Sequence, residues 1–221
     1  MEQSELEELL HDVEELKRAV RRNNPFLREV MSTRFYSAVG LGFGLVFIVY
    51  CLAAQLLASR YESLASVPSG WKLTGIIAFA VIALVGAVGK WVFFSRRAKS
   101  LDEGASYLTV LKAVYGSSWV HVILPALICM AFAVPAAIVA GHPWLIVAGA
   151  AIGWAFACNT LGLMIQRLEY LVAGWYALAT GLPALLFMES KPFLWSGIIW
   201  GGALILFGIV GLAASKRGSR A

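Results

Sequence analysis

The sequence predicts an all-α membrane protein of six transmembrane helices, preceded by an amphipathic cytoplasmic helix. Hydrophobic residues make up 60% of the 221-residue chain and charged residues only 14%, whereas soluble domains average about 45–50% and about 25%. The apolar residues also stand in uninterrupted runs of about 20 residues, the length that a helix needs to cross a bilayer. This composition excludes a disordered tail, a collagen-like fibre and a disulfide-stabilised scaffold.

Six apolar runs divide the chain, and we predict a helix in each. They cover residues 38–57, 73–94, 120–140, 144–165, 170–188 and 193–214. A backbone in lipid has to satisfy its own hydrogen bonds, which leaves only helices or closed barrels. Barrel strands would alternate apolar and polar residues over segments of roughly 10 positions, and these runs do not alternate. Short connections between the last four runs force antiparallel neighbours, so we expect one bundle over residues 38–214.

Three further segments flank or interrupt this bundle. We expect a cytoplasmic helix over 1–24, a juxtamembrane linker over 25–37 and a basic cytoplasmic tail over 215–221. Ser100 followed by Glu103 has the spacing of a capping box, which predicts an amphipathic interfacial helix over 101–115.

The distribution of basic residues predicts the orientation in the membrane. Fourteen lie on one side, at Lys17, Arg18, Arg21, Arg22, Arg28, Arg34, Arg96, Arg97, Lys99, Lys112, Arg167, Lys216, Arg217 and Arg220. Three lie on the other side, at Arg60, Lys72 and Lys191. Since Lys and Arg accumulate in cytoplasmic loops, we expect both termini in the cytoplasm and the protein in the plasma (cell inner) membrane. The excess basic residues, which give the net charge of +5, then lie mostly at the cytoplasmic surface of the bilayer. We therefore expect membrane lipid as a partner and no nucleic acid.

The first helix carries an apolar stripe of heptad spacing. Ser4 and Glu7 form a capping box at its start. The a and d positions are Leu6, Leu9, Val13, Leu16 and Val20. A stripe of this kind pairs helices in coiled coils, so the leading interpretation is self-association into a homo-oligomer. The alternatives are docking on the protein's own bundle, adsorption to the membrane interface, or binding of another protein.

Polar residues near the cytoplasmic end of the third to fifth runs are the candidate ligand site. They are His121, Asn159, Thr160, Gln166 and Glu169. Only Gly141-His142-Pro143 separates the third run from the fourth, so these runs are neighbours. We therefore expect His121, Asn159 and Gln166 to line one pocket, with Glu169 at its mouth, because polar groups at membrane depth are costly without a role. The alternative is that Asn159 and Thr160 bond neighbouring helices, at about 0.6 kcal/mol each.

Motifs for catalysis, metals and cofactors are absent from the sequence. It contains no GxSxG, HExxH, Walker A or GxGxxG segment. The three cysteines fall inside apolar runs without metal-ligand spacing, which is typical of packing residues. His121 and His142 belong to opposite membrane surfaces, so a bis-histidine haem is not expected. We therefore predict no metal, no cofactor and no catalytic residue.

Small residues spaced by four predict close contacts between helices. The pairs are Gly40–Gly44, Gly149–Gly153 and Gly197–Gly201. Such spacing lets two helix backbones approach closely in lipid, so we expect these pairs to pack the bundle.

These observations favour a non-enzymatic, self-associating component of small-solute or ion transport. The first alternative is a membrane scaffold or regulator that acts through its N-terminal helix. The second is a lipid-modifying enzyme with His121 as base and Glu169 assisting.

The topology can be tested by cysteine labelling of intact cells. We expect Ser66→Cys and Ser190→Cys to react with a membrane-impermeant maleimide from outside, because few basic residues flank them. Ser100→Cys and Ser219→Cys should react only after permeabilisation. Labelling of Ser219→Cys in intact cells would contradict the six-span topology.

Overall fold

The computed structural model describes residues 34–61, 66–101, 108 and 119–218. The long helices are α2 (Arg34–Ala58), α3 (Ser69–Leu101), α5 (Trp119–Ala140), α6 (Trp144–Ile165), α7 (Leu168–Phe187) and α9 (Gly202–Gly218). The short α8 (Pro192–Ser196) and the π-helical turn η1 (Gly197–Gly201) lead directly into α9, so the three form one crossing. Six segments of the described chain are long and apolar enough to span a membrane, which confirms the predicted all-α, six-span fold.

Helix ends differ most from the sequence prediction in α3. This helix starts before the apolar run and continues through the basic segment to Leu101. Ser100, which we expected to cap a separate interfacial helix, lies inside α3 and donates a hydrogen bond from Oγ to the carbonyl oxygen of Arg97 at 2.7 Å. The predicted segments before residue 34, nearly all of 101–115 and residues 219–221 lie outside the described residues.

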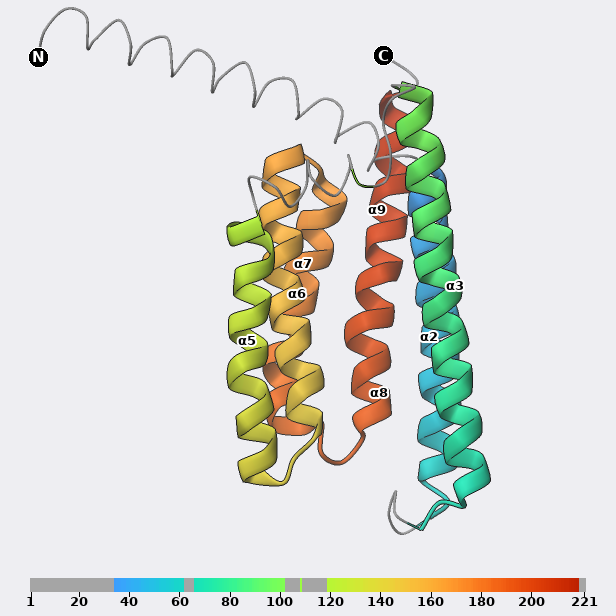
Figure 1. Cartoon of the computed structure of the whole chain (residues 1–221), viewed down its shortest axis with the longest axis vertical. Helices are drawn as coiled ribbons and strands as arrows, with labels where there is room; N and C mark the ends of the chain where they lie inside the picture. The colour runs from blue at the N-terminus through green and yellow to red at the C-terminus, as the bar shows by residue number, and fades with distance from the viewer. Residues whose placement is uncertain (1–33, 62–65, 102–107, 109–118, 219–221) are drawn as a thin grey trace, which may run out of the picture.

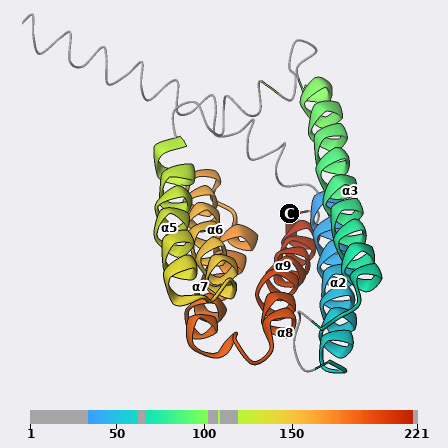
Figure 2. The same ribbon diagram turned by 60° about the horizontal axis from the view of Figure 1, so that its bottom comes forward.

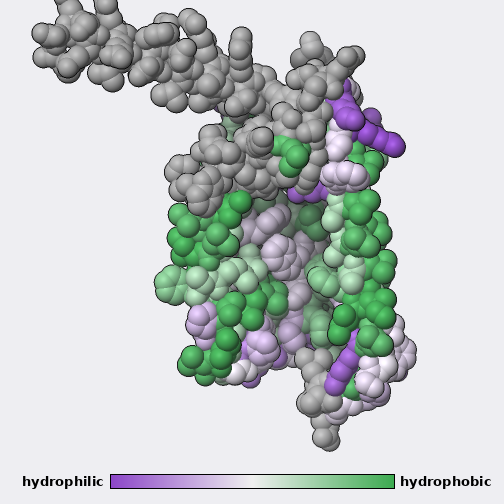
Figure 3. Space-filling view, viewed as in Figure 1, coloured by the Kyte–Doolittle hydropathy of each residue, from purple (hydrophilic) through white to green (hydrophobic). Residues whose placement is uncertain are grey.

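The helices form two groups that meet along α7 and α9. One group contains α5, α6 and α7, with α6 packed against both of the others, and the second contains α2, α3 and α9, with α2 packed along α9 (Figures 1 and 2). The start of α2 and the end of α9 lie at the same end of the bundle, here called the terminal end. The opposite end carries the turns that join α2 to α3, α5 to α6, and α7 to α8. Apolar side chains cover the outer flanks of both groups (Figure 3).

Glycine brings α2 and α9 into close contact. A Cβ atom added at Gly44 would lie 2.8 Å from the carbonyl oxygen of Gly201 and 2.9 Å from the backbone nitrogen of Ile205. A Cβ atom at Gly201 would in turn collide with the Ile48 side chain. The Gly40–Gly44 and Gly197–Gly201 spacings therefore belong to one interface, in which the helix backbones nearly touch.

The first group is packed in the same manner. On α6, a Cβ atom at Gly153 would lie 2.7 Å from Cα of Ala126 on α5, and one at Gly162 would lie 2.8 Å from Cγ of Leu171 on α7. Gly141 turns the chain between α5 and α6 with a positive φ of 69°. Gln166 does so between α6 and α7 with a φ of 53°. These tight turns keep consecutive helices antiparallel and adjacent.

One apolar core joins the two groups at the terminal end. It combines residues of α3, α6, α7 and α9, among them Phe94, Ala98, Cys158, Leu161, Ile165, Tyr170, Ala173 and Phe207. The candidate site lies beside this core.

A matched pair of glycines on α2 tests the close packing. We expect Gly44→Ala to lower the free energy of unfolding by about 1–3 kcal/mol, since the new methyl group meets backbone atoms. Gly42→Ala should be neutral or stabilise by up to about 1 kcal/mol, because nothing lies within 4 Å of its Cβ position and alanine favours a helix. Thermal unfolding in detergent measures both, and equal melting temperatures would contradict the packing.

Candidate functional site

The turn between α6 and α7 places a carboxylate inside the bundle. Gln166 adopts the left-handed conformation at the end of α6, and its backbone N–H donates to the carbonyl oxygen of Gly162. The next residue, Arg167, donates to the same oxygen at 2.9 Å. These two hydrogen bonds end α6 at Ile165. The next helix, α7, begins at Leu168, so Glu169 falls in its first turn. A negative side chain is favoured there by the helix dipole.

Glu169 meets Ser37 at Gly211, where α7, α2 and α9 converge. Glu169 is 2% exposed and Ser37 is 3% exposed, and they are the two residues of polar or charged type that the described chain buries. A Cβ atom at Gly211 would collide with Oγ of Ser37 and would lie 3.7 Å from Cβ of Glu169. The missing side chain of Gly211 is therefore what leaves room for both polar groups.

Two tyrosines complete this group. Tyr170 shares a side-chain hydrogen bond with Tyr36 of α2 and interacts electrostatically with Glu169. Both rings stand edge-on to Phe207 of α9, with centroids at 4.9 Å for Tyr170 and 5.4 Å for Tyr36. We call Tyr36, Ser37, Glu169 and Tyr170 the junction cluster, because they come from both helix groups.

The junction cluster is chemically unusual for a bundle of this composition. Burying a carboxylate away from water is costly unless hydrogen bonds or opposite charges compensate. Here Ser37 lies beside Glu169 at Gly211, Tyr170 interacts with it electrostatically, and the amide end of α7 supplies a positive potential. Such an arrangement can hold a proton or a small cation at the joint between the two groups.

The structure places Glu169 differently from our expectation. The sequence predicted it at the mouth of a pocket on the membrane surface, whereas it is buried against α9. The reason is that Gly211 leaves space for it on α9, and residues 42 positions apart in sequence cannot be recognised as neighbours from periodicity alone. Tyr36, Ser37 and Tyr170 were missed for the same reason, because they lie at the ends of apolar runs that are distant in sequence, with no spacing that relates them.

Asn159 faces α7 from α6. A Cβ atom at Gly174 of α7 would lie 2.5 Å from its Oδ1. This oxygen is buried and has no hydrogen-bond partner among the described residues. The amide therefore occupies the α6–α7 interface.

The other predicted pocket residues lie in separate places. Thr160 follows Asn159 on α6 and is half-buried, while Gln166 is exposed in the turn after α6. His121 belongs to the first turns of α5, and its side chain lies outside the described residues. Asn159 contacts α7 and Glu169 faces α9, so the structure assigns these two residues to different interfaces.

A second polar contact lies further along the same joint. The Tyr176 hydroxyl of α7 donates to the carbonyl oxygen of Ile198 in η1 at 3.0 Å. Its ring occupies the space that a side chain at Gly202 would need. Trp154 of α6 and Trp200 of η1 pack nearby with ring centroids 5.4 Å apart. A π-helical turn is rare and is often found at functional sites, because it exposes backbone groups that an α-helix would use internally.

Metal chemistry has no visible basis in the described part of the chain. No group of three or more His, Cys, Asp and Glu side chains there could hold a metal ion. Cys51, Cys129 and Cys158 are free thiols, and two of them are buried.

Comparison with protein family models, with curated proteins and with solved structures gives no match. The function is therefore inferred from the junction cluster and its surroundings.

Replacement of Asn159 tests whether its amide stabilises the contact between α6 and α7. We expect Asn159→Leu to keep or raise the melting temperature, because it removes a buried acceptor whose lack of a partner costs about 1–3 kcal/mol. Thr160→Val at the next position is the control, because it also removes a polar group from α6 and because valine has nearly the shape of threonine. A melting temperature clearly below that of Thr160→Val would show that the amide holds α6 and α7 together.

Proposed function

We propose that the protein is a self-associating component of ion or small-solute transport in the cell inner membrane, with both termini cytoplasmic. In this proposal the junction cluster binds the transported or coupling cation, in the simplest case a proton. The multi-pass helical character of the chain is the firm basis on which the proposal stands.

The observation that carries the proposal is the meeting of Glu169 with Ser37 at Gly211. An ionisable residue cut off from water in a membrane bundle is a candidate for an ion or proton pathway, because burying it has a cost that inert packing would avoid. Binding of a proton or cation changes the net charge of the cluster, and a change of charge alters interactions with neighbours strongly where the dielectric constant is low. The change would act directly on the contact of α7 with α2 and α9.

The position of the cluster supports transport over the other interpretations. It lies between two helix groups, and relative motion of such groups is how many transporters alternate access. The Tyr176–Ile198 contact gives the same joint a second polar level nearer the opposite end. The scaffold interpretation depends on Leu6–Val20, which lies outside the described residues and stays a prediction. The enzyme interpretation needs a Glu169 open to substrate, whereas this side chain is buried.

Ion flux into vesicles tests the role of Glu169. The full-length protein is reconstituted into three sets of vesicles that contain a dye selective for protons, sodium or potassium, and the entry of each ion is followed after a gradient is imposed. We expect flux above that of protein-free vesicles, and we expect Glu169→Gln to reduce it at least tenfold because the amide cannot exchange a proton.

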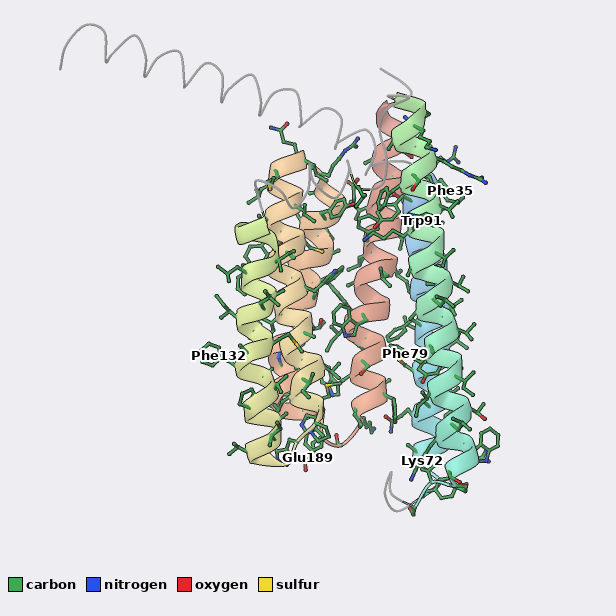
Figure 4. The ribbon with its side chains drawn as sticks, in the orientation of Figure 1. Phe35, Lys72, Phe79, Trp91, Phe132 and Glu189 are labelled. Carbon is green, nitrogen blue, oxygen red and sulfur yellow. The ribbon has the colours of Figure 1, made fainter. Side chains whose placement is uncertain are left out.

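Glu189→Gln is the matched control, since Glu189 is exposed at the opposite end of the bundle (Figure 4). It should conduct like the wild type, and both variants should elute and melt as folded proteins. Ser37→Ala provides a milder second variant in the same cluster. Wild-type flux equal to that of empty vesicles for all three ions, or unchanged flux in Glu169→Gln, would overturn the proposal.

A further inference from the structure

Basic residues are concentrated at the terminal end of the bundle. Those of the described chain are Arg34, Arg96, Arg97, Lys99, Arg167, Lys216 and Arg217. The described chain contains two acidic residues, of which Glu169 is buried and Glu189 is exposed at the opposite end. Asp102 and Glu103 follow α3 outside the described residues and offset two of these charges at most. The terminal end therefore carries an excess of positive charge.

A shallow hollow of about 350 Å³ lies between α2 and α3 at this end. Phe35 of α2 stacks on Phe93 of α3 with ring centroids 5.0 Å apart, and both rings line the hollow. Arg96, Arg97 and Ser100 line it from the following turns of α3. These α3 residues have helical spacing and so share one face of the helix. We call this space the terminal hollow; Figure 4 shows Phe35 at its place on the bundle.

The terminal hollow presents an aromatic face next to exposed cations. Phe35 is 59% exposed. Arg96 is exposed, whereas Arg97 is half-buried and already interacts with another group. Lys99 is exposed and follows Arg96 by three positions, so it lies beside it on the α3 surface. Guanidinium and ammonium groups form strong hydrogen bonds with carboxylates, so this surface suits an acidic segment.

The chain itself contains such a segment. Seven of its 13 acidic residues lie among the first 15 positions, which hold no Lys or Arg. In the helix that the sequence predicts there, four of these residues are spaced by three, four and three and share one face. They are Glu5, Glu8, Asp12 and Glu15, here called the acidic flank. This face runs beside the Leu6–Val20 stripe and does not coincide with it.

The length of the chain allows the acidic flank to reach the terminal hollow. Eighteen residues separate Glu15 from Arg34, and Arg34 directly precedes Phe35. An extended chain spans about 3.3–3.6 Å per residue, so reach is not limiting. A tether of this length also keeps the segment at a high effective concentration. Several exposed ion pairs can then hold it, although each of them alone contributes little.

We propose that the acidic flank docks in the terminal hollow of its own bundle, with its carboxylates at Arg96 and Lys99. The cytoplasmic leaflet, where we place this end, carries a negative potential that repels an acidic segment. The basic end of the bundle is the nearest opposite charge. A lipid head group offers one phosphate to the same cations, whereas the acidic flank offers four carboxylates on one tether. Docking leaves the Leu6–Val20 stripe available to a second copy, and it does not depend on ion flux at the junction cluster.

Photo-crosslinking identifies the occupant of the hollow. The full-length protein is made with benzoylphenylalanine in place of Phe35, reconstituted in vesicles that contain phosphatidylglycerol, irradiated and digested. We expect mass spectrometry to find adducts of position 35 with peptides from residues 1–22. Mixing of isotope-labelled and unlabelled copies should show that both peptides come from one chain. Benzoylphenylalanine in place of Phe132, which is 75% exposed on α5, is the control and should give lipid adducts only.

Charge reversal tests whether the acidic flank makes the contact. We expect Glu8→Lys with Asp12→Lys to lower the yield of the peptide adduct about tenfold, because like charges then face each other. Adding Arg96→Glu and Lys99→Glu to this variant should restore the yield. The matched control is Glu7→Lys with Glu14→Lys, which makes the same change of charge on another face of the predicted helix and should crosslink like the wild type.

Three results would overturn the proposal. The first is that position 35 crosslinks to lipid alone, which would make an anionic head group the occupant. The second is that its peptide adducts join different copies only, which would make the hollow an interface between chains. The third is an equal loss in the flank variant and its matched control, or no restoration by the reversed α3 charges, either of which would reduce the effect to overall charge.

Discussion

Helices in a bilayer gain little from the hydrophobic effect when they associate, because lipid is as apolar as their own side chains. Close van der Waals contact has to replace it, and glycine makes that contact possible here. The contact of Gly44 with Gly201 holds α2 against η1 and α9, and Gly153 and Gly162 hold α6 between α5 and α7. These small positions thus determine how closely α2 approaches α9 and how closely α6 approaches α5 and α7.

The same constraint creates the candidate site. Gly211 on α9 leaves a space that a larger residue would fill, and Ser37 and Glu169 occupy it from α2 and α7. Glycine thus allows close packing at one level of the bundle and makes room for a carboxylate at another. Because the carboxylate lies at the joint between the groups, its charge is coupled to how these groups contact each other.

The α2–α3 pair shows what happens where aromatic rings replace glycine. Rings such as Phe79 keep the helices apart, and the small residues beyond them then enclose a cleft instead of a contact. The two packing modes on either side of α2 therefore produce different features. Close contact with α9 surrounds a buried polar cluster, and loose contact with α3 leaves a space open to lipid.

Apolar runs and short connections were sufficient to predict the six helices, because length and backbone hydrogen bonding decide whether a segment crosses a bilayer. The predicted run 144–165 coincides with α6, and the tight turns at Gly141 and Gln166 join neighbours as expected. The burial of Glu169 beside Gly211 and the direction of Asn159 toward Gly174 were not predictable in this way. A helix that is apolar on all sides has no periodic pattern to show which face turns toward which neighbour. Only the contacts between helices distant in sequence determine that rotation, and with it the position of every polar group in the bundle.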